Sequence, residues 1–317
     1  MTAALVFPGQ GSQTVGMGKA LADAFPAAKA VFDEVDAALS DKLSQLIWEG
    51  PIDRLTLTEN AQPALMAVSL AAVRVLEAEK GLDLKRHVSL VAGHSLGEYS
   101  ALAAARAFSL ADTARLLRLR GKAMQAAVPV GQGAMAALLG IDAENARKAV
   151  AEAAEGGAVC QVANDNDPGQ VVISGVKAAV ERAGEIAKKY GAKRAMMLNV
   201  SAPFHCALMQ PAADAMQAAL AEVKIAAPVV PLVANVLASA VSSPEDIRKR
   251  LVEQVTGTVR WRESVAYMAS RGVTHVYEVG AGKVLSGLVK RIVPSLEARA
   301  IGTPEDIAAA ASGLLAV

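Results

Sequence analysis

Residues Val88 to Ser100 read V-S-L-V-A-G-H-S-L-G-E-Y-S. The apolar run Val88 to Ala92 predicts a buried strand, and the segment from Glu98 to Arg106 predicts a helix rich in Ala and Leu. Between them lies Gly-x-Ser-x-Gly, which at a strand-to-helix turn is typical of a nucleophile elbow. The glycines remove Cβ atoms that would clash in so sharp a turn, and the first N–H groups of the helix stay free to stabilise an oxyanion. We therefore predict that Ser95 is a nucleophile. The alternative is a Gly-Ser turn that only packs a helix onto a strand.

Composition limits the class of protein. Of the 317 residues 53% are apolar and 20% are charged, which predicts a globular chain with one large domain or two. A net charge of +1 and an aromatic content of 3% argue against nucleic acid or a membrane surface as the main partner. Cys160 and Cys206 match no metal-ligand spacing and cannot form a disulfide framework. We expect no bound metal, no secretory signal, no membrane span and a cytoplasmic location.

The order of predicted elements favours an α/β fold with a largely parallel sheet. The run Ala3 to Phe7 predicts a first strand, and Pro63 to Glu79 predicts a helix that a proline opens. Residues 131–198 follow the order βαββαβ, with a polar turn predicted from Asn164 to Gly169, and this order is the split βαβ, ferredoxin-like pattern. We therefore divide the chain into a catalytic domain of residues 1–130 and 199–317 and a ferredoxin-like insert of residues 131–198.

One predicted helix carries an arginine on its apolar face. Ser109 to Ala127 predicts an amphipathic helix capped by Ser109, with Arg115, Arg118 and Lys122 on the solvated face. Arg120 falls inside the apolar stripe. A guanidinium that points at a core needs a carboxylate partner, which is either an acid of the protein or the carboxylate of a substrate.

A serine nucleophile needs a base, and the chain has four histidines. His87 lies at a basic and therefore solvated edge, the side chain of His94 should diverge from its neighbour Ser95, and His275 lies inside a predicted strand. His205, in a loop before a helix, is the remaining choice for the base. No Asp or Glu stands out as the third member of a triad.

Several separated motifs occur in an order that resembles a known family. They are Phe7-Pro8-Gly9-Gln10-Gly11-Ser12-Gln13, Gly93 to Ser100, Arg120-Gly121-Lys122, His205 to Met209 and Tyr277-Glu278-Val279-Gly280. Together they resemble the malonyl-CoA:acyl carrier protein transacylases of bacterial type II fatty acid synthesis, and the resemblance spans nearly the whole chain. It implies an α/β-hydrolase-like core with a ferredoxin-like insert.

The resemblance implies a ping-pong transfer of malonyl from malonyl-CoA to the phosphopantetheine thiol of acyl carrier protein. Ser95 would form the covalent malonyl-enzyme, and His205 would take the serine proton and later activate the thiol. Backbone N–H groups of Gln10 and Leu96 would form the oxyanion hole. Arg120 would bind the free carboxylate of malonate.

Further residues follow from the same resemblance. A backbone carbonyl near Gln254 would orient the histidine, and Gln62 would line the pocket. Phe204 stands where enterobacterial members often carry serine, and it should exclude branched acyl groups. No resident cofactor is implied, because CoA and phosphopantetheine enter as parts of the substrates.

Other functions remain open at this point. A related malonyl transferase of a malonate decarboxylase or a polyketide system would differ in its carrier protein. A serine thioesterase or esterase would use the same elbow with water as the acceptor, and a scaffold that binds carrier protein would form no acyl-enzyme. We expect a monomer. An acidic carrier protein would require a basic surface near the site, for which the candidates are Arg118, Lys188, Lys189, Arg194, Lys283, Lys290 and Arg291.

Overall fold

The computed structural model describes residues 2–154 and 156–315. A mostly parallel sheet contains, in spatial order, β10 (Glu297–Ile301), β9 (His275–Val279), β1 (Ala3–Phe7), β2 (Leu90–Gly93), β7 (Leu232–Ala234) and β8 (Ser239–Val241). All neighbours pair in parallel except β7 and β8, which pair antiparallel. The largely parallel α/β sheet predicted from the sequence is confirmed.

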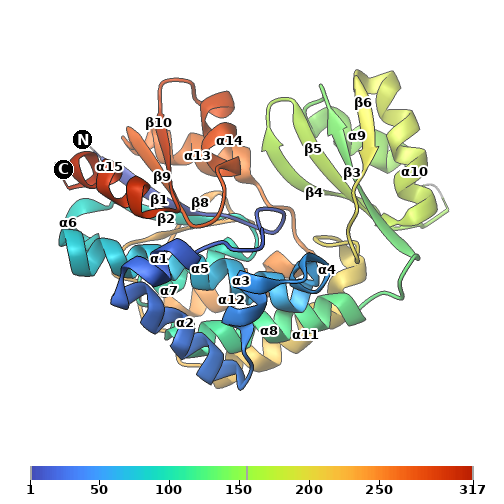
Figure 1. Cartoon of the computed structure of the whole chain (residues 1–317). Helices are drawn as coiled ribbons and strands as arrows, with labels where there is room; N and C mark the ends of the chain where they lie inside the picture. The colour runs from blue at the N-terminus through green and yellow to red at the C-terminus, as the bar shows by residue number, and fades with distance from the viewer. Residues whose placement is uncertain (1, 155, 316–317) are drawn as a thin grey trace.

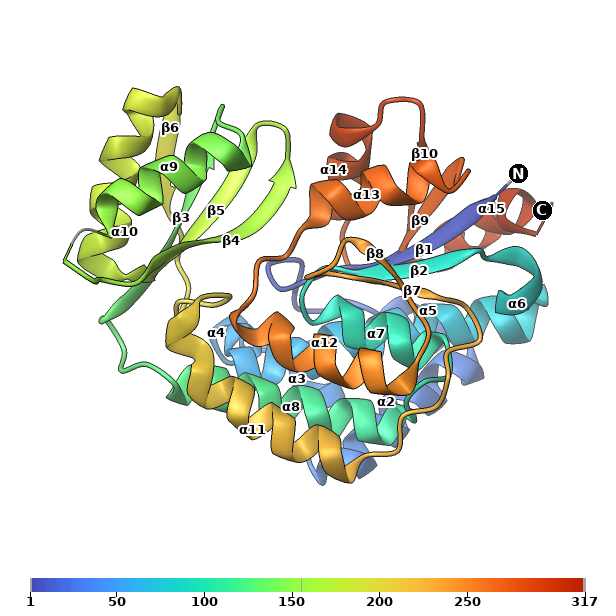
Figure 2. The ribbon, with the colours of Figure 1, turned by 180° about the vertical axis from the view of Figure 1, so that it is seen from behind.

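Helices cover both faces of this sheet (Figures 1 and 2). Alternate residues of the central strand β1 face opposite cores, because side chains of a strand point to opposite faces in turn. Leu5 packs in the larger core and Val6 in the smaller one. The larger core involves α1 (Lys19–Ala24), α2 (Pro26–Leu39), α3 (Leu43–Glu49), α4 (Ile52–Thr56), α5 (Thr58–Lys80), α6 (Leu84–His87), α7 (Gly97–Ala104), α8 (Leu110–Ala126), α11 (Gln210–Glu222), α12 (Pro244–Thr256) and α15 (Pro304–Leu314). The smaller core involves α13 (Trp261–Ser270) and α14 (Val284–Ile292).

A second, antiparallel sheet stands beside the first (Figure 1). Its strands, in spatial order, are β4 (Cys160–Asp167), β5 (Gln170–Val176), β3 (Gly133–Leu139) and β6 (Arg194–Met197). Helices α9 (Ala143–Ala153) and α10 (Lys177–Ile186), followed by the 3₁₀ turn η1 (Ala187–Tyr190), cover one face around a core of their own. The opposite face carries a small apolar cluster that includes Met135 and Val172, against which Phe204 packs.

Strand β4 joins the second sheet to the rest of the molecule. Backbone hydrogen bonds link Asp165 N–H to Val259 O (3.0 Å) and Val259 N–H to Ala163 O (2.8 Å). The buried carboxylate of Asp165 pairs with Arg262, and Asp167 pairs with Arg291. Both aspartates belong to strand β4, and the two arginines balance their charges. The prediction of a polar turn from Asn164 to Gly169 is therefore wrong, because the strand continues to Asp167. Two bulges in the pairing of β4 with β5 allow the strand to continue to Asp167.

Other predicted elements also need correction. Helix α5 begins at Thr58, so that Pro63 lies inside it instead of opening it. Burial of nearly its whole length outweighs the hydrogen bond that proline cannot make. His87 is buried, and its Nδ1 accepts from Asp83 N–H (3.0 Å). The sequence also predicts a helix from Ala143 to Glu155; α9 ends at Ala153, and Glu155 lies outside the described residues.

Helix α5 is also the one described helix that is long and apolar enough, by length and composition, to cross a membrane. Of its most apolar window 83% is buried inside the protein, which is typical of a core helix.

Candidate active site

The turn between β2 and α7 holds Ser95 in a strained conformation. Ser95 has φ of 53°, in the left-handed region that residues other than glycine rarely adopt. A Cβ on Gly93 would lie 1.9 Å from the carbonyl carbon of Gly97, and a Cβ on Gly97 would lie 2.2 Å from Phe7 O. Both positions therefore require glycine, for the steric reason anticipated from the sequence.

Asn235, which follows β7, ties the two sides of this turn together. Its Oδ1 accepts from Ser95 N–H (2.9 Å), and its Nδ2 donates to Gly93 O (2.7 Å). Asn235 is 1% exposed. A buried amide that pairs with backbone on both sides of the turn stabilises the strained φ of Ser95.

His205 lies against the serine. Its Nε2 is 2.8 Å from Ser95 Oγ, and its Nδ1 is 2.9 Å from Gln254 O. A carbonyl oxygen only accepts, so Nδ1 carries the proton and Nε2 accepts from the Ser95 hydroxyl. Burial, followed by the positive charge of Arg120, lowers the pKa of His205 to about 3, so the ring is neutral near pH 7. The backbone carbonyl of Gln254 thus occupies the place of the missing triad acid.

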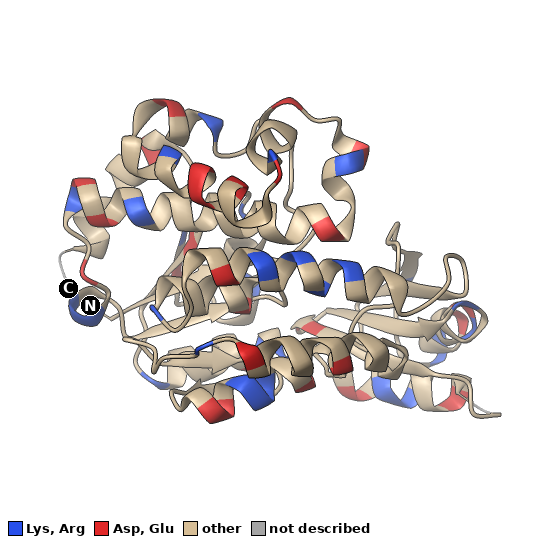
Figure 3. Cartoon of the chain, turned by 90° about the horizontal axis from the view of Figure 1, so that it is seen from below, with Lys and Arg blue, Asp and Glu red and all other residues tan. Residues whose placement is uncertain are grey.

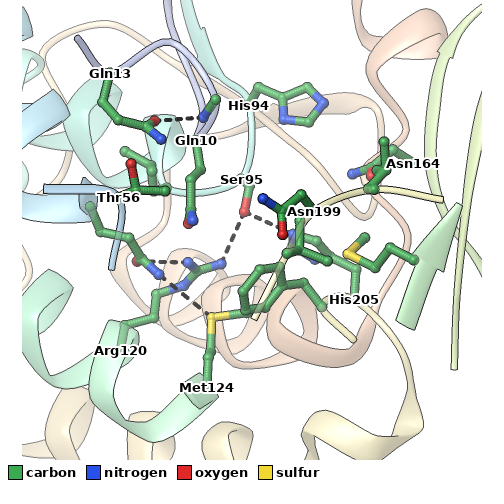
Figure 4. A pocket seen from close by; sticks show the side chains of 17 residues that line it. Gln10, Gln13, Thr56, His94, Ser95, Arg120, Met124, Asn164, Asn199 and His205 are labelled. Carbon is green, nitrogen blue, oxygen red and sulfur yellow. Dashed lines mark hydrogen bonds between the residues drawn. The ribbon is translucent and has the colours of Figure 1, made fainter. Parts of the chain in front are cut away.

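Arg120 reaches the same hydroxyl from the other side (Figure 4). It is 1% exposed, and Gly121 beside it brings α8 so close to α5 that a Cβ there would lie 2.5 Å from Glu59 Cα. Arg120 Nη1 donates to Gln62 Oε1 (2.8 Å), and Nη2 donates to Gln254 Oε1 (2.8 Å) and to Ser95 Oγ (3.2 Å).

The partners of Arg120 decide between the two possibilities left by the sequence. In residues 2–154 and 156–315 no carboxylate lies within 4.0 Å of its guanidinium nitrogens, and its Nε has no partner. Burial lowers the pKa of Arg120, while Tyr99 and Glu98 oppose that shift, and a guanidinium in such surroundings stays charged. The internal acid expected under one alternative is therefore absent from direct contact with Arg120.

These side chains meet at one cavity of about 330 Å³. Ser95, His205 and Arg120 line it together with apolar side chains, among them Phe204, which is half-buried. The remaining lining comes from Gln10, Gly11, Gln13, Thr56, Gln62, His94, Leu96, Met124, Met135, Asn164, Leu198, Asn199 and Val200. An anion bound at Arg120 would place an attached carbonyl group close to Ser95.

The predicted oxyanion donors lie at this cavity. Leu96 is the N-cap residue of α7, and Gln10 lies in the loop after β1. Neither backbone N–H donates to any acceptor within the part of the chain that the structure describes. Two such N–H groups beside a serine are suited to stabilise an oxyanion.

The other predictions have mixed outcomes. His94 points away from the serine, as expected, and its Nε2 lies 2.9 Å from Asn166 Oδ1 (Figure 4). Arg118, predicted on the solvated face, is only partly exposed (17% of its side chain), and it donates to Asn60 Oδ1 (2.8 Å) and pairs with Asp41. No group of His, Cys, Asp and Glu suited to a metal is present in residues 2–154 and 156–315.

Comparisons with known proteins show the family to which the chain belongs. A family model described as the acyl transferase domain matches residues 4–304. The malonyl CoA-acyl carrier protein transacylase of Escherichia coli strain K12 is 51% identical over 97% of this chain and 98% of its own length. The chain belongs to the acyl transferase family.

Solved structures extend the match to the whole fold. The acyl-carrier-protein S-malonyltransferase of Bartonella henselae has a TM-score of 0.96 and is 58% identical, with 99% of each chain covered. A malonyl-transacylase crystallised in complex with its type II polyketide acyl-carrier protein has a TM-score of 0.95 and is 45% identical, covering 99% of this chain and 100% of its own.

Two buried residues of this acyltransferase escaped the sequence reasoning. Asn235 lies in an uncharged stretch that predicts only a strand and loops, so nothing marked it. Glu98 follows the elbow directly, and a charged residue at the start of an otherwise apolar helix was the available signal. Glu98 is 0% exposed and contacts the side chain of Gln254, whereas the family resemblance implies a role only for a backbone carbonyl near Gln254.

Proposed function

We propose that this acyltransferase moves the malonyl group from malonyl-CoA to the phosphopantetheine thiol of acyl carrier protein, for fatty acid synthesis, through a malonyl-Ser95 intermediate. One observation carries the proposal. Ser95 Oγ lies between a neutral histidine nitrogen at 2.8 Å and a buried guanidinium nitrogen at 3.2 Å, and that guanidinium pairs with no carboxylate among the residues that the structure describes. The first group can take a proton, and the second can hold the far end of a dicarboxylic acyl group.

The acylation step follows from these contacts. The Ser95 hydroxyl proton passes to His205 Nε2 as Oγ bonds to the thioester carbon, and the N–H groups of Gln10 and Leu96 stabilise the resulting oxyanion. When the C–S bond breaks, the CoA sulfur leaves and takes the proton from His205. The Gln254 carbonyl keeps the imidazole oriented throughout.

Deacylation uses the same groups in reverse order. His205 takes the thiol proton of phosphopantetheine, the sulfur attacks the malonyl-Ser95 ester, and the proton returns to Ser95 Oγ. Both half-reactions need only the chain's own groups, with CoA and phosphopantetheine entering as parts of the substrates, so we propose no resident cofactor.

The finer description of the fold is part of this proposal. We infer an α/β-hydrolase-like catalytic domain of residues 1–130 and 199–317 and a ferredoxin-like insert of residues 131–198. The strand-turn-helix elbow supports the first assignment, and the order β4-β5-β3-β6 with two helices on one face supports the second. We also propose a cytoplasmic enzyme, and the two free, buried cysteines are consistent with a reducing compartment.

The test is to incubate the protein with malonyl-CoA and measure its intact mass. We expect one malonyl adduct per chain, no adduct in Ser95→Ala, and loss of the adduct on addition of holo acyl carrier protein. Release of free malonate at a comparable rate without carrier protein would instead identify a thioesterase. An adduct that persists in Ser95→Ala would remove Ser95 from the proposed role.

A further inference from the structure

Glu98 is a buried acid that the proposed reaction does not use. It lies on α7 one turn after Ser95, is 0% exposed and does not line the cavity. Its Oε1 accepts from Asn235 N–H (3.3 Å), and its Oε2 accepts from Gln254 Nε2. Both oxygens face N–H donors, so the ionised carboxylate is the form that fits this arrangement. Burial raises the pKa of Glu98 to about 8, although the two N–H donors and Arg120 oppose that rise, so the ionised form predominates above that pH.

The side chain of Gln254 connects this acid to the reacting groups. Its Nε2 donates to Ser95 O (2.9 Å) as well as to Glu98, and its Oε1 accepts from Arg120 Nη2 (2.8 Å). An amide has one accepting end and one donating end, so acceptors around Nε2 fix Oε1 toward the guanidinium. A reversed amide would place an NH₂ group against the donors of Arg120.

The separation between Glu98 and Arg120 has an electrostatic consequence. A carboxylate in direct contact with Arg120 would occupy the guanidinium and compete with a substrate carboxylate. A carboxylate that acts across the Gln254 amide orients the guanidinium and partly balances its charge while leaving it available. Ion pairs with Arg120 are absent from the described ranges 2–154 and 156–315, which is consistent with this arrangement.

We propose that Glu98 is a positioning residue that sets selectivity for malonyl: through the Gln254 amide it holds Arg120 ready for the carboxylate of the acyl group. This inference rests on the proposed role of Arg120. It assigns the discrimination between malonyl and a neutral acyl group to three residues, of which only Arg120 would touch the substrate.

The first test compares malonyl-CoA with acetyl-CoA in the acylation of Glu98→Gln at about pH 9, above the pKa of about 8 at which Glu98 ionises. Glutamine keeps the shape and removes the charge, and its NH₂ group must face one of the two N–H donors. We expect the malonyl-to-acetyl ratio of kcat/KM to fall about tenfold, with KM for malonyl-CoA raised and any loss of kcat shared by both substrates. The matched control is Ser100→Ala on the same helix, which removes a buried hydroxyl that has no hydrogen-bond partner among the described residues. It should leave the ratio unchanged.

The second test asks whether Glu98 acts through Gln254. Gln254→Met removes the amide and keeps the backbone carbonyl that holds His205. We expect this variant to lower the same ratio by a similar factor and the double variant to lower it less than threefold further. If the factors by which the two single variants lower the ratio multiply in the double variant, Glu98 and Gln254 act independently, and the proposal is overturned. Should Glu98→Gln fail to fold, an unchanged ratio in Gln254→Met would overturn it as well, because the amide is the only proposed link.

Arg120→Ala separates failure of this inference from failure of the proposed function. If it leaves the ratio unchanged, Arg120 does not read the carboxylate, and both ideas fall. If it lowers the ratio strongly while Glu98→Gln changes it less than twofold, only the role of Glu98 is wrong. An equal loss for both substrates in Glu98→Gln would mean that the acid only supports the fold, and would also overturn the proposal.

Discussion

Two non-glycine residues at the site hold left-handed backbone, Ser95 with φ of 53° and His205 with φ of 58°. Such conformations cost on the order of 1–3 kcal/mol each and persist only where surrounding contacts enforce them. For Ser95 the contacts come from Asn235 and Gln254, and for His205 one comes from the Gln254 carbonyl. The strain therefore lies in the two residues whose side chains must meet, with 2.8 Å between Ser95 Oγ and His205 Nε2.

Asn235→Ala tests how the elbow is held. The variant leaves Ser95 N–H and Gly93 O without their partners, so we expect a loss of about 2–3 kcal/mol in the free energy of unfolding. Acylation by malonyl-CoA and by acetyl-CoA should fall by similar factors, because the serine and not the carboxylate site is disturbed. Urea unfolding and acylation rates measure the two effects, and a loss confined to malonyl-CoA would contradict this role.

Phe204→Ala tests the width of the cavity. Phe204 packs on the apolar cluster of the second sheet at the cavity wall. Its removal should raise kcat/KM for methylmalonyl-CoA relative to malonyl-CoA about tenfold or more, since rejection of one methyl group is worth about 1–3 kcal/mol. An unchanged preference would show that another side chain limits the acyl group. Leu208→Ala, which lies outside the cavity lining, serves as the control.

The protonation of His205 predicts the acid limb of the pH profile. Its pKa is lowered to about 3, so the ring stays a neutral base as pH falls through the usual histidine range and is protonated only near pH 3. Acylation by acetyl-CoA, which avoids the carboxylate site, should therefore be flat between about pH 5 and pH 7. A rapid-quench profile with a midpoint between pH 6 and 7 would show that His205 titrates normally.

Among the elements, β4 both belongs to the second sheet and connects that sheet to the rest of the molecule. Asp165 in it is 0% exposed and accepts from Arg262 Nε and Nη2 at 2.8–3.1 Å, whereas the Arg262 side chain is 36% exposed. Together with the backbone bonds to Val259, this pair fixes the strand that carries Asn164 to the cavity wall.

The unequal burial of this pair predicts unequal losses of stability. Arg262→Met strands a buried carboxylate and should cost about 3 kcal/mol of unfolding free energy. Asp165→Asn leaves an arginine that can turn to water and should cost about 1 kcal/mol. Urea unfolding of both variants checks the order, and equal losses would show that burial of Asp165 is not the deciding factor.

At the scale of the whole molecule, charges of both signs are interspersed over the helices (Figure 3), in keeping with a net charge of +1. Fewer residues therefore remain as candidates for a basic surface that would bind an acidic carrier protein. Several of its candidates have acidic partners within the protein: Arg118 pairs with Asp41, Lys188 with Glu185, Lys189 with Glu152 and Arg291 with Asp167. Within the described chain Arg194, Lys283 and Lys290 have no such ion pair. These three remain the better candidates.

Local features of the molecule follow from the order of its amino acids alone. A short apolar run, two glycines that close packing requires and a helix start define the elbow within a few residues of one another, and the apolar stripe around Arg120 can be read from its own helix. The alternation of strands and helices was enough to predict a parallel sheet, because each element can be recognised from the periodicity of its own apolar residues.

Contacts between residues far apart in the chain could be found only in the folded molecule. Ser95 and His205 are 110 positions apart, and Glu98 and Gln254 are 156 positions apart. Their contacts depend on how strands and helices stack, which no local pattern encodes. The same holds for Arg120, which contacts no acid in the described part of the chain. A charge predicted to be buried indicates that a partner is needed but not which residue or substrate supplies it.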